Sequence, residues 1–395
     1  MKILVLNCGS SSLKYQLIDM SNQDVLAKGN YERIGTPGSF VTHKKDDFKI
    51  EVKQDVSNHE EAIKIVMDQL IHAEYGVINS LDEISGIGHR VVHGGEKFTK
   101  SVVVTEEVIS GIKECIELAP LHNPGAVMGI EGCKKLMPNT PMVVVFDTAF
   151  HQTLPEKAYI YPIPYKYYQD YKVRKYGFHG TSHKFVSLRT AEILDKKPED
   201  LKIVVCHLGQ GASLCAVNAG KSVDTSMGLT PVAGIPMVTR SGDIDPSVVT
   251  FMMKKENLTA EEVENVLNKQ SGLHGISGEN PDSRDIETAA SNGNERAKLA
   301  VENYCYTVAQ YIGKYAVAMN GIDVISFAGG VGENGPEMRA NICAYLEFLG
   351  VNIDDGKNKV RGDEAIITTD DSKVKVMVVP TNEELMIAKE TLELI

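Results

Sequence analysis

Residues 3–19 read ILVLNCGSSSLKYQLID, and residues 203–219 read IVVCHLGQGASLCAVNA. Each stretch starts with branched apolar residues, passes through a turn of small residues, and continues into a second, largely apolar run. This pattern predicts a β-hairpin in both places. Asn7 aligns with His207 at an offset of 200 residues. The repetition favours two similar domains, although any two β-hairpins share these features.

Other apolar runs extend the pattern to an α/β protein. Segment 57–75 predicts a helix, because its apolar residues recur at helical spacing and Ser57 with Glu60 forms a capping-box pattern. Four runs predict buried strands: MVVVF (142–146), KIVVC (202–206), DVISFA (323–328) and VKVMVV (374–379).

Bulk composition narrows the classes of function. The 395 residues fit two or three domains, and the formal net charge of -12 disfavours nucleic acid or an anionic membrane as the main partner. The N-terminus resembles no signal peptide, and no apolar run is long enough to span a bilayer. Seven cysteines without a Cys-x-x-Cys pattern predict buried, unpaired thiols and a cytoplasmic protein.

Three predicted turns are rich in the small residues that are typical of phosphate-binding loops. Backbone N–H groups can converge on a phosphate where glycines leave room, and serines add hydroxyl donors. Lys14 adds a positive charge beyond the first turn. Any one of these could be an ordinary tight turn, and none matches a P-loop or a dinucleotide-binding fingerprint. The predicted turns are Gly9–Ser12, His207–Gly211 and Gly330–Asn334.

Polar clusters stand beside these turns. They lie at 89–96, directly after an expected strand ISGIG, at 178–183, and in expected loops at 122–124 and 239–246. The i,i+4 histidine pairs 89/93 and 179/183 have the spacing of zinc ligands, but glycines within both stretches argue against a regular helix. Together, histidine and arginine side chains are the groups that stabilise a transferring phosphoryl group.

Nine motifs resemble those of the acetate kinase family in the same order, from the first strand to the C-terminus. They are NCGSSSLKYQLID (7–19), GHRVVHGGE (88–96), APLHNPG (119–125), FDTAFHQTLP (146–155), YGFHGTSHK (176–184), HLGQGAS (207–213), TRSGDIDP (239–246), AGGVGENG (328–335) and PTNEEL (380–385).

The resemblance implies two duplicated ribonuclease H-like, actin-like ATPase domains with a βββαβα core and an ATP cleft between them. Residues 1–148 would form the N-terminal domain on the acid-substrate side, closed by a C-terminal helix at 384–395. Residues 149–383 would form the nucleotide-binding domain. It also implies a homodimer.

Site residues follow from the resemblance, motif by motif. Catalytic roles fall on Arg90, His122, Asp147, His179 and Arg240. Acid binding falls on Arg90, with a small apolar pocket of Val92, Leu121, Phe178 and Pro231. Nucleotide contacts fall on Ser10, Ser12, Lys14, His207, Leu208, Gly209, Gln210, Gly211, Asp282, Ser283, Arg284, Gly330, Val331, Gly332, Glu333 and Asn334. Asn7 and Glu383 would bind Mg²⁺, or Mn²⁺ in its place.

The expected reaction is ATP plus acetate giving ADP plus acetyl phosphate, a reversible phosphoryl transfer to a carboxyl group. A propionate or butyrate kinase of the same superfamily remains an alternative, since one methylene is worth only about 1–3 kcal/mol in an apolar pocket. A non-kinase ATPase related to actin or Hsp70 is a second one. Gln210 replaces the family's usual Asn, which leaves room for pyrophosphate as donor.

Overall fold

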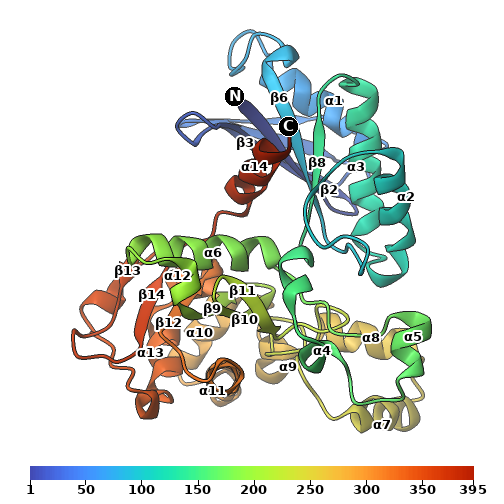
Figure 1. The fold of residues 1–395 in the computed structure, drawn as a ribbon. Helices are drawn as coiled ribbons and strands as arrows, with labels where there is room; N and C mark the ends of the chain where they lie inside the picture. The colour runs from blue at the N-terminus through green and yellow to red at the C-terminus, as the bar shows by residue number, and fades with distance from the viewer. The chain divides into compact units, whose positions relative to one another are not determined.

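The computed structural model describes all residues, 1–395, as two compact units. The first unit combines Met1–Phe150 with the C-terminal segment Asn382–Ile395, and the second spans His151–Thr381 (Figure 1). None of the helices has the length and apolar character needed to cross a membrane.

The first unit contains an eight-stranded mixed sheet in the order β5-β4-β3-β2-β1-β6-β8-β7. The central strand β1 pairs antiparallel with β2 and parallel with β6. The strands are β1 (Lys2–Cys8), β2 (Ser12–Asp19), β3 (Asp24–Glu32), β4 (Phe40–Lys45), β5 (Phe48–Lys53), β6 (Ile84–Val91), β7 (Val102–Val103) and β8 (Met142–Phe146).

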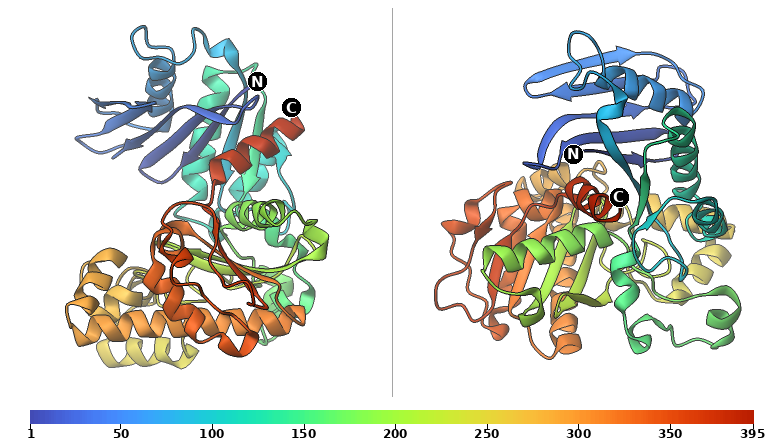
Figure 2. Two further views of the ribbon diagram at one scale, coloured as in Figure 1. Left: turned by 90° about the vertical axis from the view of Figure 1, so that its left-hand side faces the viewer. Right: turned by 45° about the horizontal axis from the view of Figure 1, so that its top comes forward.

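Helices cover both faces of this sheet. On one face lie α1 (His59–Leu70) and α3 (Asn123–Leu136), with α2 (Glu106–Glu114) beside α3. On the other lies α14 (Glu383–Leu394), which contacts β1, β6 and β8 (Figure 2). Alternate residues of β1 belong to the hydrophobic cores on opposite faces of the sheet. Ile3 and Val5 pack with α14, whereas Leu4 and Leu6 face α1.

A glycine sets the close approach of α14 to the sheet. A Cβ at Gly88 would lie 2.6 Å from Cγ2 of Ile387 and 2.5 Å from Oγ1 of Thr391. Only glycine leaves room for the helix there. This packing fixes the start of α14 beside the ends of β1 and β6.

The second unit contains a six-stranded sheet in the order β11-β10-β9-β12-β14-β13. The strands are β9 (Lys202–Leu208), β10 (Ala212–Asn218), β11 (Lys221–Thr225), β12 (Val324–Ala328), β13 (Ala365–Ile366) and β14 (Lys375–Val378). Helix α6 (Gly180–Ile193) packs on one face and the long α11 (Glu295–Met319) on the other (Figure 1).

Shorter helices surround this sheet. They are α4 (Glu156–Tyr159), α5 (Lys166–Tyr171), α7 (Pro246–Glu256), α8 (Ala260–Lys269), α9 (Gly272–Ser277), α10 (Ser283–Ser291), α12 (Gly329–Asn334) and α13 (Pro336–Ala344).

The two sheets repeat one core, which confirms the predicted α/β class. The orders β3-β2-β1-β6-β8 and β11-β10-β9-β12-β14 are equivalent, with two antiparallel pairings followed by two parallel ones. Asn7 pairs with Lys14 in the first hairpin, and His207 pairs with Ser213 in the second. The hairpin echo in the sequence therefore reflects a repeated arrangement.

Several local predictions were wrong. The N-cap of α1 is Asn58, whose side chain accepts from the N–H of Glu61, so the predicted cap of Ser57 and Glu60 is displaced by one residue. The helix also ends at Leu70, before the predicted end at 75. Strand β6 continues through Val91, three residues beyond the expected strand ISGIG.

Helix starts account for the other errors. Segment 180–183 opens α6, because glycine is tolerated in a first helical turn whose N–H groups have no helical partner anyway. Asn123 and Pro124 likewise begin α3 instead of a loop. All seven cysteines are buried and unpaired, as predicted.

Candidate active site

An ion pair between Arg90 and Asp147 lies at the ends of two neighbouring strands of the first unit. Nε of Arg90 donates to Oδ1 of Asp147 at 2.9 Å, and Nη2 donates to Oδ2 at 2.7 Å. The parallel register of β6 and β8 places Arg90 opposite Val145, two residues before Asp147. This contact occupies one edge of the guanidinium and leaves Nη1 on the other edge without a hydrogen bond.

The electrostatics of this pair favour the charged form of Arg90. Burial works against the charge of Arg90, but attraction to Asp147 and the hydrogen bonds between them outweigh it, so the pKa of Arg90 is raised. The side chain of Asp147 is only 3% exposed. Both carboxylate oxygens of Asp147 therefore accept charge-assisted hydrogen bonds in a buried position.

A small cavity beside this pair contains further charged groups. It is lined by Val5, Asn7, Lys14, Tyr15, Arg90, Glu383, Glu384 and Ile387. Burial and the nearby carboxylates of Asp147 and Glu384 raise the pKa of Glu383 to about 7, although Arg90 opposes this. The cavity thus brings together two predicted metal ligands, Asn7 and Glu383, with Lys14 and Arg90.

In the second unit, His179 lies where α6 begins, opposite the hairpin of β9 and β10. Its Nδ1 is 2.9 Å from Oγ of Ser213, and its ring stacks on His207 with centroids 4.3 Å apart. A Cβ at Gly211 would lie 3.4 Å from both Nε2 of His179 and Nη1 of Arg240. The imidazole and the guanidinium therefore converge on the backbone of the β9–β10 turn.

Arg240 differs from Arg90 because no carboxylate neutralises it. Its Nη1 donates to the carbonyl of Pro231 at 3.2 Å, and it forms no ion pair. Burial lowers the pKa of Arg240. A desolvated guanidinium without a counter-charge is costly unless an anion binds beside it.

The glycine-rich turn of β9–β10 lies next to the start of α12. A Cβ at Gly209 would lie 3.8 Å from the backbone nitrogen of Gly330, and one at Gly330 would meet nothing within 4 Å. Segment 330–334 was predicted as a turn but is helical. A ligand can therefore approach Gly330 through open space, beside the amide groups of the first turn of α12.

The carboxylate of Glu333 accepts hydrogen bonds from two backbone N–H groups of the protein. It accepts from the N–H of Gly329 at 2.7 Å and from the N–H of Thr381 at 3.0 Å. These bonds hold the start of α12 to the segment that follows β14. Gln210, by contrast, is exposed and has no hydrogen-bond partner.

Asp282 and Arg284 pair with each other at the start of α10. Asp282 caps the helix, and Arg284 donates to it at 3.0 and 2.6 Å, which lowers the pKa of Asp282 to about 2. The side chain of Arg284 is 86% exposed. This loop presents a charged surface next to Ser283.

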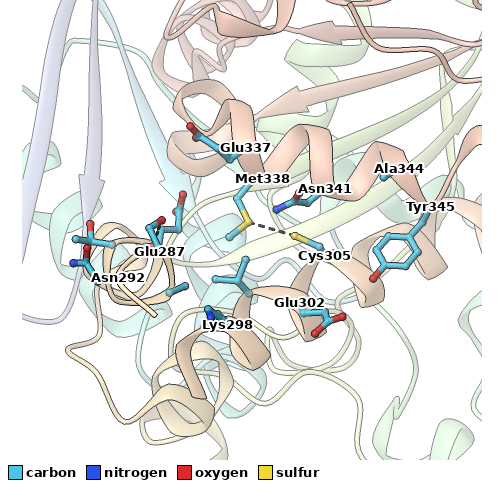
Figure 3. A pocket seen from close by; sticks show the side chains of 14 residues that line it. Glu287, Asn292, Lys298, Glu302, Cys305, Glu337, Met338, Asn341, Ala344 and Tyr345 are labelled. Atoms are coloured by element: carbon cyan, nitrogen blue, oxygen red, sulfur yellow. Dashed lines mark hydrogen bonds between the residues drawn. The ribbon is translucent and has the colours of Figure 1, made fainter. Parts of the chain in front are cut away.

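A large cavity between α10, α11 and α13 was not predicted from the sequence. It has a volume of about 830 Å³. Figure 3 shows the carboxylates of Glu287, Glu302 and Glu337 around it, with Cys305 and Met338 in contact at its floor. Its lining starts one helical turn beyond Ser283 on α10 and includes Glu337 and Met338, just after α12.

The predicted apolar contacts occupy both units. Val92 and Leu121 belong to the first, where Leu121 is 70% exposed just before α3. Phe178 and Pro231 belong to the second, where Phe178 is buried and its carbonyl bonds to His151. His122 forms the N-cap position of α3.

Two groups of predicted residues are therefore assembled within units, and some participants were missed. Asn7, Lys14, Arg90, Asp147 and Glu383 come together in the first unit. His179, His207, Gly211, Pro231 and Arg240 come together in the second. The sequence interpretation overlooked Glu384, Ser213 and His183 as neighbours of these groups, although the motifs PTNEEL, HLGQGAS and YGFHGTSHK contain them.

Comparison with known proteins gives one consistent result. A family model described as the acetokinase family matches residues 2–389. The acetate kinase of Thermoanaerobacterium thermosaccharolyticum is 61% identical over 392 residues, covering 99% of this chain and 98% of its own. The acetate kinase of Carboxydothermus hydrogenoformans is 59% identical over 396 residues, covering 100% and 99%.

Solved structures agree. Acetate kinase of Porphyromonas gingivalis superposes with a TM-score of 0.97 at 48% identity, covering 99% of both chains. A propionate kinase from Francisella tularensis superposes with a TM-score of 0.93 at 44% identity, covering 100% of both chains.

Proposed function

This chain belongs to the acetokinase family, and from that premise we propose that it transfers the γ-phosphoryl group of ATP to the carboxylate of acetate. The observation that carries the proposal is the convergence of His179 and the unpaired Arg240 on the β9–β10 turn. Positive charge without a counter-ion, beside exposed backbone amides, is suited to a phosphoryl group.

The acid is assigned to Arg90. Acetate is already ionised at neutral pH, so its oxygen needs no general base to act as a nucleophile. Asp147 holds one edge of the guanidinium, and Nη1 on the other edge can donate to a carboxylate. Asp147 therefore acts by orienting Arg90 and by offsetting the cost of burying its charge.

Mg²⁺ fits the first unit. No group of three or more His, Cys, Asp or Glu side chains forms a metal cage in the chain. Mg²⁺ commonly binds through one or two protein oxygens with water and phosphate completing its shell, and the amide of Asn7 and the carboxylate of Glu383 are such donors. When bound, the ion neutralises phosphate charge.

The enzyme is further proposed to be a cytoplasmic homodimer.

The cavity between α10, α11 and α13 is assigned to the base and ribose of ATP, because it begins one turn from Ser283 and has a volume typical of ligand pockets. The chain contains no tryptophan, so Asn341→Trp would place a single tryptophan, which can be excited selectively, in the lining. ATP should change its fluorescence, and acetate should not. Phe348→Trp, at an exposed position outside the lining, is the control; equal responses of the two variants would reject the assignment.

A hydroxamate assay for acyl phosphate tests the proposed reaction. Acetate, propionate and butyrate should each be compared with ATP, GTP and pyrophosphate as donors. We expect the highest kcat/KM for acetate with ATP. Propionate is the second candidate acid because a propionate kinase shares this fold at 44% identity. Absence of any acyl hydroxamate would leave only ATP hydrolysis and would reject the proposal.

A further inference from the structure

A buried hydrogen-bonded chain lies behind His179. Oγ of Ser213 is 2.9 Å from Nδ1 of His179 and 2.7 Å from Nε2 of His183. Ser213 and His183 are both fully buried. The two rings are one helical turn apart at the start of α6, and the N–H of His183 donates to the carbonyl of His179 at 2.9 Å.

Counting protons leaves two possible directions for the hydrogen bonds that link His183, Ser213 and His179. The single hydroxyl hydrogen of Ser213 can point to one ring, so the other ring has to donate to Oγ. Burial, with smaller contributions from His151 and His207, lowers the pKa of His183 well below its ordinary value, so that ring is neutral and has one N–H. The question is which nitrogen of His183 bears it.

The buried Nδ1 atom of His183 decides which ring nitrogen of His183 bears the proton. Nδ1 of His183 is buried and has no hydrogen-bond partner. An N–H placed there would be an orphaned donor, which costs about 1–3 kcal/mol, whereas a bare ring nitrogen is the more tolerated defect. The proton of His183 is therefore on Nε2, and this N–H donates to Oγ of Ser213. The hydroxyl of Ser213 in turn donates to Nδ1 of His179.

The hydrogen bond at Nδ1 of His179 determines the protonation of Nε2 on the opposite side of the same ring. With Nδ1 accepting, the proton of neutral His179 is on Nε2, the atom directed at the Gly211 backbone beside Nη1 of Arg240. We propose that Ser213 and His183 are positioning residues that fix His179 in the Nε2–H tautomer, so that it presents a donor to the transferring phosphoryl group. The tautomer assignment rests on the hydrogen bonds and on the buried, neutral ring of His183, and its catalytic use rests on the proposed function.

Nuclear magnetic resonance tests the tautomer without substrates. Long-range ¹H–¹⁵N spectra of the full chain labelled at histidine report which ring nitrogen is protonated, and the signal lost in His179→Gln assigns the ring. We expect a protonated Nε2 and an unprotonated Nδ1 in His179 at neutral pH. A proton on Nδ1 would overturn the proposal whatever reaction the enzyme catalyses.

Kinetics of Ser213→Ala test the catalytic use. Loss of an orienting partner should lower kcat roughly 10- to 100-fold with the KM for ATP and for acetate changed less than about 2-fold. The His179 signals should then show both tautomers. Ser213→Thr, which keeps the hydroxyl, should recover most of the loss.

Ser222→Ala is the matched control. Ser222 is also fully buried in the same sheet and is 2.8 Å from a histidine nitrogen, but its partner is His151. Its kcat should stay within about 2-fold of the wild-type value. Equal kcat losses in Ser213→Ala and Ser222→Ala, or an unchanged kcat in Ser213→Ala, would refute the positioning role, while the tautomer measurement on the wild-type chain stays decisive if a variant does not fold.

Discussion

At the scale of single residues, the two arginines differ in their partners, and this difference predicts different defects. Arg90 is neutralised by Asp147, whereas Arg240 donates only to uncharged acceptors, the carbonyl of Pro231 and the sulfur of Met237. The first guanidinium is therefore oriented before any ligand binds, and the second has a charge that no carboxylate in the chain offsets.

Arg240→Ala should lower kcat by roughly 100-fold or more, because it removes a charge that stabilises the phosphoryl group in the transition state. ATP binding should be nearly unchanged, since the glycine-rich segments remain. Steady-state kinetics combined with equilibrium dialysis of ATP would separate the two effects. A turnover number within a few-fold of wild type would remove Arg240 from the reaction.

Arg90→Ala should mainly raise the KM for acetate, by about 10-fold or more, because a charge-assisted hydrogen bond to the acid is lost. It also leaves Asp147 buried without its partner, so stability should fall. Asp147→Asn serves as the comparison, since it weakens the same pair but retains the guanidinium. An acetate KM that is normal in Arg90→Ala would place the acid elsewhere.

The residue types of these groups could be predicted from the sequence, but their pairing could not. Arg90 was expected to bind a carboxylate, and the structure shows it bound to Asp147 through the register of β6 and β8. Register depends on packing between strands 57 residues apart in sequence, which local patterns do not encode.

At the scale of elements, strands were predicted better than helix starts. Apolar runs marked the buried strands β8, β9, β12 and β14 well because both faces of these strands are covered. Helix α12 was missed because four glycines or small residues after a strand resemble a turn. The cap of α1 moved by one residue because Ser57 and Asn58 are both good caps and tertiary packing selects between them.

The open space at Gly330 gives a test at this scale. Gly330→Ala should leave thermal stability unchanged or slightly higher, because the added methyl meets no atom within 4 Å and alanine favours a helix. It should raise the KM for ATP, because the methyl group would block a phosphate from the α12 amides. Gly313→Ala in α11 is the control, since it also meets nothing within 4 Å. Equal ATP affinity in the two variants would exclude phosphate binding at Gly330.

At the scale of the whole molecule, the sequence echo correctly indicated a duplicated core, but it could not show what each copy adds at its edges. The first sheet is extended by β4 and β5, whose residues are partly polar and exposed, and the second by the two-residue β13. Edge strands with few buried residues have weak apolar patterns, so they escape prediction from the sequence.

Buried histidines in the first unit predict loss of stability in acid. Burial is the main cause that lowers the pKa of His43 to about 4, of His89 to about 3 and of His93 to about 4. Between these values and the ordinary value near 6.5, the unfolded chain binds protons that the folded chain does not. The free energy of unfolding should therefore fall as pH decreases from 6.5 toward 4, by about 1.4 kcal/mol per pH unit for each such group.

Urea unfolding between pH 5 and 7 measures this slope. His89→Gln should reduce it by about one proton, even if stability falls at every pH. A slope in His89→Gln equal to that of wild type would show that His89 is not held neutral in the folded chain.

The proposed enzyme passes a phosphoryl group from ATP to the acid and not to water. Phosphorus NMR of the enzyme with ATP, Mg²⁺ and acetate follows every phosphorus-containing species in one sample. We expect acetyl phosphate and ADP to appear in equal amounts, and we expect omission of acetate to stop ADP formation. Inorganic phosphate released at the same rate with and without acetate would contradict it.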